Sequence, residues 1–166
     1  MIDAKRLYDD DFIAWSRQQA EALRAAARGG SNQAIDWENV AEEIEDLGKS
    51  QRRELSSRIR EIILHLVKLT NSPRSEPRPG WRSSIRRQRA EIEDLLKDNP
   101  SLGREVAVMI REQIPRAVKA AIDDLADRGE LLNVQRQNLN DEPGLLFTEE
   151  QVLGDWFPPE PEAPRG

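Results

Sequence analysis

One apolar stripe runs through the first half of the chain without losing its helical phase. At about 100° per residue, all of its members stay on one side of a single helix. Asp36 can cap the start of that helix, and Ile35 and Val40 can form a hydrophobic staple across the cap. The stripe therefore predicts one continuous helix from Asp36 to about Asn71, roughly 50 Å long. Its members are Trp37, Val40, Ala41, Ile44, Leu47, Gly48, Gln51, Leu55, Ile59, Ile62, Leu66 and Leu69.

Gly48 lies on this stripe, and the phase does not change there. A break at Gly48 would let the two halves of the helix choose different faces, so we expect no break. The missing side chain should instead allow a neighbouring element to pack closely. Beyond it, the run "IILHLVKL" is apolar nearly all round, which predicts a buried hub. We expect this hub to contain Ile59, Ile62, Ile63, Leu66 and Leu69, facing Ile85, Ile92 and Leu95.

Helical patterns also flank the long helix. A first helix is expected from about Asp9 to Arg28, capped by Asp9 or Asp10 and stopped by a glycine pair. A third helix should begin near Trp81 and end at "DNPS", which should also cap the next helix.

The C-terminal third completes an all-α fold. A fourth helix should begin near Ser101, and its apolar face shifts by about 100° at Pro115, which predicts a kink or break at about Ile110–Pro115. Residues 130–147 read as irregular, and Thr148 with Gln151 forms a capping box for a short last helix. The sequence predicts a bundle of four to five helices in one domain, residues 1–157, and a disordered proline-rich tail, residues 158–166.

Composition limits the chemistry and the cellular location that we expect for the protein. There is no cysteine, so disulfides and thiolate metal ligands are excluded. The first residues have no apolar segment typical of a secretory signal, and no apolar run approaches the roughly 20 residues that span a bilayer. We expect a cytoplasmic protein with no membrane association.

Several motifs occur in an order that resembles a known family. They are "YDDDFIAW" from Tyr8, "DWENVAEEIEDLGKSQRREL" from Asp36, "LHLVK" from Leu64, "WRSSIRRQRAEI" from Trp81 and "PSL" from Pro100. Together they resemble the bacterial family called domain of unknown function 29, over Tyr8 to about Phe157. The resemblance implies an all-helical protein and carries no established activity.

An arginine-rich stretch stands out in an acidic chain. Residues 73–89 hold six arginines and one acid, although the net charge of the chain is −6 and that of the remainder is −11, from 19 basic and 30 acidic residues. Arg82, Arg86 and Arg89 share one helix flank, here called the arginine strip. Glu38, Glu42 and Glu45 have the same spacing on the long helix and are called the acidic strip.

The two strips suggest contact between chains. If the third helix folds back antiparallel, the strips lie roughly 27 Å apart along the axis, too far to pair within one chain. The hypothesis is therefore that the arginine strip binds another protein or a second copy of this chain, as a homodimer. The simpler interpretation is that nearby acidic side chains screen the arginine strip. Nucleic-acid binding through Arg74–Arg89 is the alternative, disfavoured by the acidic remainder.

Catalytic machinery is not recognisable. The strongest metal candidate is the acid-rich stretch Glu38–Asp46 with His65, but Glu42 and His65 would lie roughly 34 Å apart on a continuous helix. His65 should instead be half-buried beside the hub with Glu61 as its partner, a runner-up polar site. The interpretation is a non-enzymatic helical interaction protein without cofactor or metal. A metal-dependent helical enzyme is kept as a third hypothesis.

Overall fold

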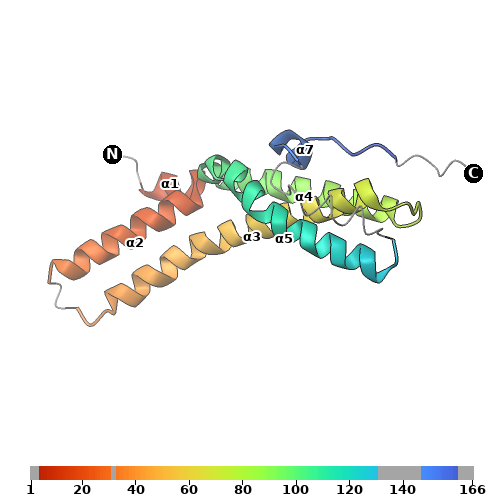
Figure 1. Cartoon of the computed structure of the whole chain (residues 1–166). Coiled ribbons are helices and arrows are strands. Elements are labelled where there is room, and N and C mark those ends of the chain that lie inside the picture. The colour runs from red at the N-terminus through yellow and green to blue at the C-terminus, as the bar shows by residue number, and fades with distance from the viewer. Residues whose placement is uncertain (1–3, 31–32, 131–146, 161–166) are drawn as a thin grey trace, which may run out of the picture. The chain divides into compact units, whose positions relative to one another are not determined.

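The computed structural model describes residues 4–30, 33–130 and 147–160, and all of its regular structure is helical (Figure 1). This confirms the all-α prediction. The elements are α1 (Ala4–Asp10), α2 (Phe12–Arg28), α3 (Trp37–Asn71), α4 (Arg78–Asp98), the 3-10 helix η1 (Pro100–Arg104), α5 (Val106–Asp127) and α7 (Glu149–Leu153). Across these described ranges, no helix combines the length and apolar character needed to cross a membrane.

The long central helix is confirmed as α3, which spans 35 residues and passes through Gly48 without interruption. Asp36 caps it, since its carboxylate accepts a hydrogen bond of 3.3 Å from the backbone N–H of Asn39. The expected hydrophobic staple does not bury its members. Ile35 and Val40 remain 44% and 40% exposed.

The expected first helix is two helices, because the chain is interrupted at Asp11. Asp11 has extended backbone geometry and caps α2 with its side chain, which accepts a 2.8 Å hydrogen bond from the Ala14 N–H. The prediction that Asp9 or Asp10 caps this helix is therefore wrong. Asp11 is fixed by a partner that sequence reading did not find, because it also accepts hydrogen bonds from the backbone N–H and the hydroxyl of Ser101.

The third predicted helix begins three residues earlier than expected. α4 starts at Arg78, and Pro79 fits its first turn because N–H groups there have no intrahelical partner. After α4 the chain forms η1 before α5, so the expected α-helical start near Ser101 is wrong. Asn99 does not cap η1 with its side chain, which donates to the carbonyl of Leu95.

Pro115 lies inside α5, which continues from Val106 to Asp127. The predicted break is therefore wrong, whereas the kink stays a prediction. Pro115 is exposed, so water can hydrate the carbonyl that lacks an N–H partner. The apolar face also does not jump at the proline. Buried residues alternate in steps of three and one along the whole helix: Val106, Met109, Ile110, Gln113, Ile114, Ala117, Val118, Ala121, Ile122 and Leu125.

The chain divides into two compact units, and the single-domain assignment stays a prediction. The first unit holds Met1–Leu55 and Glu93–Glu105, and the second holds Ser56–Ile92 and Val106–Gly166. The first has a small core, whose buried apolar residues are Ile13, Ala20, Ala41, Leu55, Leu95 and Leu102.

The second unit contains the predicted hub. Ile59, Ile62, Ile63, Leu66 and Leu69 all have 0% exposure, and Ile85 and Ile92 are buried with them. Leu95 is also buried but belongs to the first unit, so its position facing the hub stays a prediction. The sequence reading underestimated α5, which supplies ten buried residues.

The predicted disordered tail was expected to begin at residue 158, but Pro158 and Glu160 pack against the rest of the chain. Pro158 is buried, and the Glu160 carboxylate pairs with Arg78. Residues 161–166, and residues 131–146 of the expected irregular region, lie outside the described residues.

Candidate functional site

The arginine strip meets the chain's own C-terminal segment, defined here as residues 147–160. The spacing of Arg82, Arg86 and Arg89 places all three on one flank of α4, and their guanidinium carbons lie 6.0, 5.2 and 5.0 Å from the centre of the Phe157 ring. Each distance is within the range of a cation–π interaction. The strip therefore has a partner within the same chain that the sequence reading did not identify.

Arg89 makes the most specific contacts of the strip. Its guanidinium donates hydrogen bonds of 2.8–2.9 Å to the carbonyls of Gln151, Val152 and Trp156. These carbonyls are at and just beyond the C-terminus of α7, where such groups lack intrahelical partners and the helix dipole favours a cation. Burial lowers the pKa of Arg89, but the group stays charged at any physiological pH.

The C-terminal segment has local order of its own. α7 begins with the predicted capping box, in which Thr148 and Gln151 exchange hydrogen bonds of 3.0 and 3.2 Å between side chain and backbone. Val152 is fully buried, and the rings of Phe147 and Trp156 lie 6.2 Å apart. The segment therefore presents Phe157 to the strip from a short structured turn beside α4 (Figure 1).

A carboxylate completes the contact with α4. Glu160 pairs with Arg82 and, at 3.0 Å, with Arg78. The hydrogen bond from Arg82 is the main cause that lowers the pKa of Glu160, and the charge of Arg78 adds to it. Phe157 and Glu160 are three residues apart, so ring and carboxylate engage successive arginines of one helix face.

Two further arginines of the arginine-rich stretch, Arg74 and Arg78, also have partners. Arg78 is 3% exposed and donates to the carbonyls of Leu69 and Ser72, while Arg74 lies 3.4 Å from Glu130. Trp81 is buried, as expected for a core residue, and the Lys68 ammonium lies 5.7 Å from its ring centre. These contacts occupy groups that a nucleic-acid surface would need free.

The acidic strip has its partner on α2. The Glu45 carboxylate lies 2.9 Å from the Arg24 guanidinium, and Glu38 lies 3.5 Å from the same side chain. The Arg24 hydrogen bond is the main cause that lowers the pKa of Glu45. Glu42 is exposed. No ion pair joins the acidic and arginine strips among those found in the described residues.

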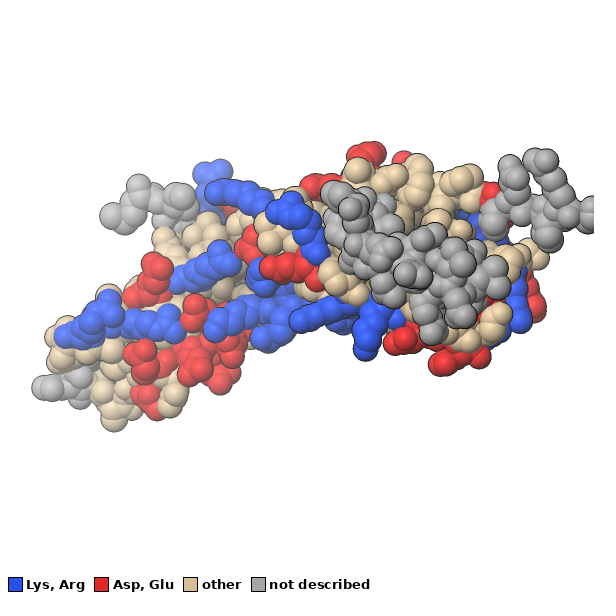
Figure 2. All heavy atoms as spheres, viewed as in Figure 1, with Lys and Arg blue, Asp and Glu red and all other residues tan. Residues whose placement is uncertain are grey.

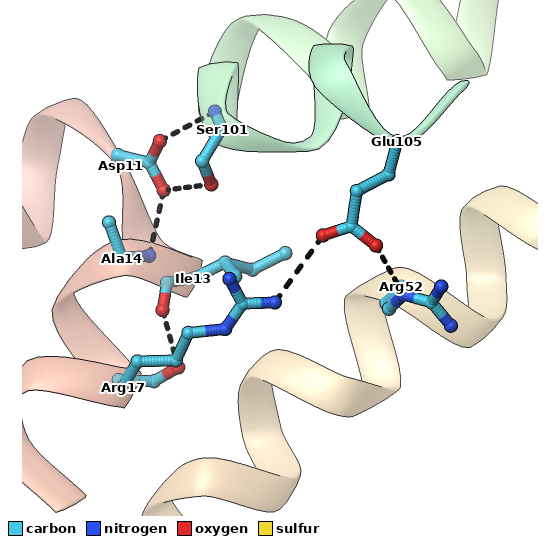
Figure 3. A network of polar contacts seen from close by, with 8 residues as sticks. Asp11, Ile13, Ala14, Arg17, Arg52, Ser101 and Glu105 are labelled. Carbon is cyan, nitrogen blue, oxygen red and sulfur yellow. Dashed lines mark hydrogen bonds and ion pairs between the residues drawn. The ribbon is translucent and has the colours of Figure 1, made fainter. Parts of the chain in front are cut away.

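A polar network holds the helices of the first unit together (Figure 3). Glu105 lies between two arginines, at 3.4 Å from Arg17 and 2.5 Å from Arg52. The Arg52 hydrogen bond is the main cause that lowers the pKa of Glu105. One carboxylate, directly after η1, thus connects an arginine of α2 with an arginine of α3.

A basic band lies over α2 and α3 of this unit, bordered by acidic side chains (Figure 2). The same unit contains a pocket of about 140 Å³, lined by Ser16, Arg17, Glu45, Gly48, Lys49 and Arg52. This volume is well below the several hundred Å³ of a typical small-molecule site. Its cations pair with carboxylates, since Lys49 lies 2.9 Å from Asp46 and both arginines hold Glu105.

His65 and Glu61, the runner-up polar site of the sequence, lie in contact. The His65 Nε2 atom lies 2.9 Å from the Glu61 carboxylate, and the His65 side chain is 12% exposed. Burial is the main cause that lowers the pKa of His65, although Glu61 opposes the shift. Lys68 and Asp124 form an ion pair with each other, and both charges act on the imidazole. Lys68 lowers the pKa of His65, whereas Asp124 raises it. Among the described residues, no three acidic or histidine side chains are grouped to hold a metal ion.

The first half of α3 shows an apolar strip that the sequence stripe placed in the core. Val40 and Leu47 are 40% and 52% exposed, and Ile44 between them is half-buried. On the same turns Ala41 and Gly48 are buried. A Cβ at Gly48 would overlap the Ser16 hydroxyl of α2, which confirms the expected close packing. α2 therefore covers one flank of the stripe and leaves the other exposed.

Comparison with known proteins agrees with this helical architecture. No curated protein matches the sequence. A crystal structure described as an alpha-helical protein of unknown function from Rhodospirillum rubrum is similar, with 25% identity, a TM-score of 0.71 and 91% of each chain covered. Residues 7–157 match the family described as "Domain of unknown function DUF29". The chain belongs to this family, as its ordered motifs suggested.

Proposed function

We propose that this chain works by binding another protein, without catalysing a reaction, and that the first half of α3 carries the binding face. The observation that supports this is the pair of exposed aliphatic side chains Val40 and Leu47, seven residues apart on one helix. Seven residues are nearly two helical turns, so the two side chains differ by only about 20° around the axis. They form one strip, with half-buried Ile44 about 40° from Val40.

The strip has the chemistry of a helix-docking surface. Covering a large aliphatic side chain contributes about 1.5–3 kcal/mol relative to leaving it exposed, so the strip can supply useful binding energy. Asp36 and Glu43 are exposed and lie within about 60° of Val40 on one border. The partner that fits is an amphipathic helix with aliphatic residues three, four or seven apart and Lys or Arg beside them. Charge would then set the register and the rate of association.

Site-specific photocrosslinking in the native cell tests this proposal. A photoreactive residue at position 47 should crosslink to one partner protein. The crosslink should fall on a helix of that partner that has an aliphatic and a basic face. The matched control is position 53, which is exposed on the same helix about 220° from Val40. Equal labelling from both positions, or labelling of segments without such a helix, would contradict the proposal.

The labelled partner then allows a quantitative test. Leu47→Ala should weaken its binding by about tenfold, which corresponds to about 1.4 kcal/mol of lost burial. Arg53→Ala should leave the affinity within twofold. An unchanged affinity for Leu47→Ala would show that the strip does not form the interface.

A further inference from the structure

We propose that the arginine strip is a binding site for a segment with an aromatic ring followed by a carboxylate, and that the C-terminal segment of a second copy of this chain can fill it. The chain's own segment occupies the site in the structure. A segment from another copy would make the same contacts in its place.

Three separate features of the segment are recognised by α4. The three guanidinium carbons lie 5.0–6.0 Å from the centre of the Phe157 ring. The Glu160 carboxylate pairs with Arg82 and Arg78. Arg89 holds three backbone carbonyls, which do not depend on side-chain identity. Ring and carboxylate therefore determine specificity, while the carbonyls fix the position of the chain.

The segment brings its own shape and the complementary charge. Its capping box closes within four residues, and its two other rings, of Phe147 and Trp156, contact each other. It carries the acids Glu149, Glu150, Asp155 and Glu160 and no basic residue, whereas the strip is basic. Nothing in these contacts requires the segment and the strip to come from the same copy.

The exchange between copies is a matter of competition. A segment tethered to its own chain has a high effective concentration, in the millimolar range for short connections. The same segment from a second copy competes poorly until the internal contact is weakened. Exchange of identical elements between copies is a low-cost route to a dimer, because the contacts already exist in the monomer.

Mixing two complementary full-length variants tests the exchange. Phe157→Ala impairs the segment but keeps the strip, whereas Arg89→Gln impairs the strip but keeps the segment. Each variant alone should sediment as a monomer, and an equimolar mixture at low salt should form a heterodimer, because only the mixed pair offers one intact contact. A mixture that sediments like the separate variants would overturn the exchange.

A peptide measurement tests the site itself and does not depend on the Arg89 variant. The labelled peptide of residues 147–160 should bind full-length Phe157→Ala protein in fluorescence anisotropy. A peptide with the Phe157→Ala change should bind at least tenfold more weakly. Adding Arg87→Ala to the receptor is the control, since Arg87 is exposed on the same helix outside the strip, and it should change the affinity less than twofold.

The outcomes separate recognition from general attraction. Circular dichroism of each variant should match that of the unchanged protein, so a lost interaction is not a loss of folding. Absence of binding up to 1 mM peptide, as an order-of-magnitude limit for a specific contact, would overturn the proposal. Equal binding of a scrambled peptide of the same charge would overturn it as well, because charge alone would then explain the interaction.

Discussion

Gly48→Ala should destabilise the protein, although it introduces the best helix-forming residue inside a long helix. Alanine in place of glycine favours an exposed helix interior by about 1 kcal/mol. At position 48 the new Cβ overlaps the Ser16 hydroxyl, which is fully buried and donates a 2.9 Å hydrogen bond to the Ile13 carbonyl. Either Ser16 rotates and loses that bond, or the helices separate, and each costs about 1–3 kcal/mol. After the gain of about 1 kcal/mol in helix propensity is subtracted, we expect a net loss of up to about 2 kcal/mol in the free energy of unfolding.

A double-mutant cycle followed by urea denaturation and circular dichroism checks this reasoning. Without the Ser16 hydroxyl, the nearest atoms to the new Cβ are the residue 16 Cβ at 3.5 Å and the Ile13 Cα at 3.8 Å, which are ordinary contacts. In the Ser16→Ala background, Gly48→Ala should therefore stabilise the protein by up to about 1 kcal/mol. Gly80→Ala is the control, because a Cβ there meets nothing within 4 Å, and it should not destabilise. The close packing of α2 on α3 would be refuted if Gly48→Ala stabilised the otherwise unchanged protein, or had the same effect in both backgrounds.

Three further predictions concern the core, the α2 cap and the histidine. Leu66→Ala should lower the free energy of unfolding by about 2–5 kcal/mol, because Leu66 is fully buried in the hub; a loss below about 1 kcal/mol would show that the hub is not central. Asp11→Ala should lower it by about 1–3 kcal/mol in the same assay, because the cap and both Ser101 hydrogen bonds are lost, whereas Asp10→Ala, at an exposed ion pair, should cost no more than about 1 kcal/mol. The NMR titration of His65 should give a pKa below its usual value of about 6.5. The unfolded imidazole then binds its proton first, so stability should be full above about pH 6.5 and fall as the pH drops below it; a pH dependence unchanged in His65→Gln would contradict this.

The sequence by itself determined the features that depend on nearby residues. The continuity of α3 follows from a stripe that keeps its phase for 33 residues, from Trp37 to Leu69, and the α7 capping box closes within four residues. The hub was recognisable for the same reason, since a helix that is apolar nearly all round must be buried. Such patterns reflect the periodicity of one helix and need no knowledge of its neighbours.

Tertiary structure alone decided which partner each polar group has. Asp11 caps α2 in place of the expected Asp9 or Asp10, and it is also bound by Ser101, 90 positions away. Arg89 reaches carbonyls 62 to 67 positions further along the chain. The sequence contains many acidic side chains and backbone carbonyls that could bind the arginine strip. Helical spacing does not tell which of them does. The distance between two elements in space is set by how their apolar faces pack.

The coverage of α3 shows the same limit for apolar residues. The stripe contains Val40, Ala41, Leu47 and Gly48 with equal claim to the core, yet α2 buries only the two small residues. Small residues let a neighbouring helix approach closely, as the Ser16 contact at Gly48 shows, and that approach fixes which flank is covered. Periodicity therefore determined that α3 has an apolar side, and packing determined which part of that side remains exposed.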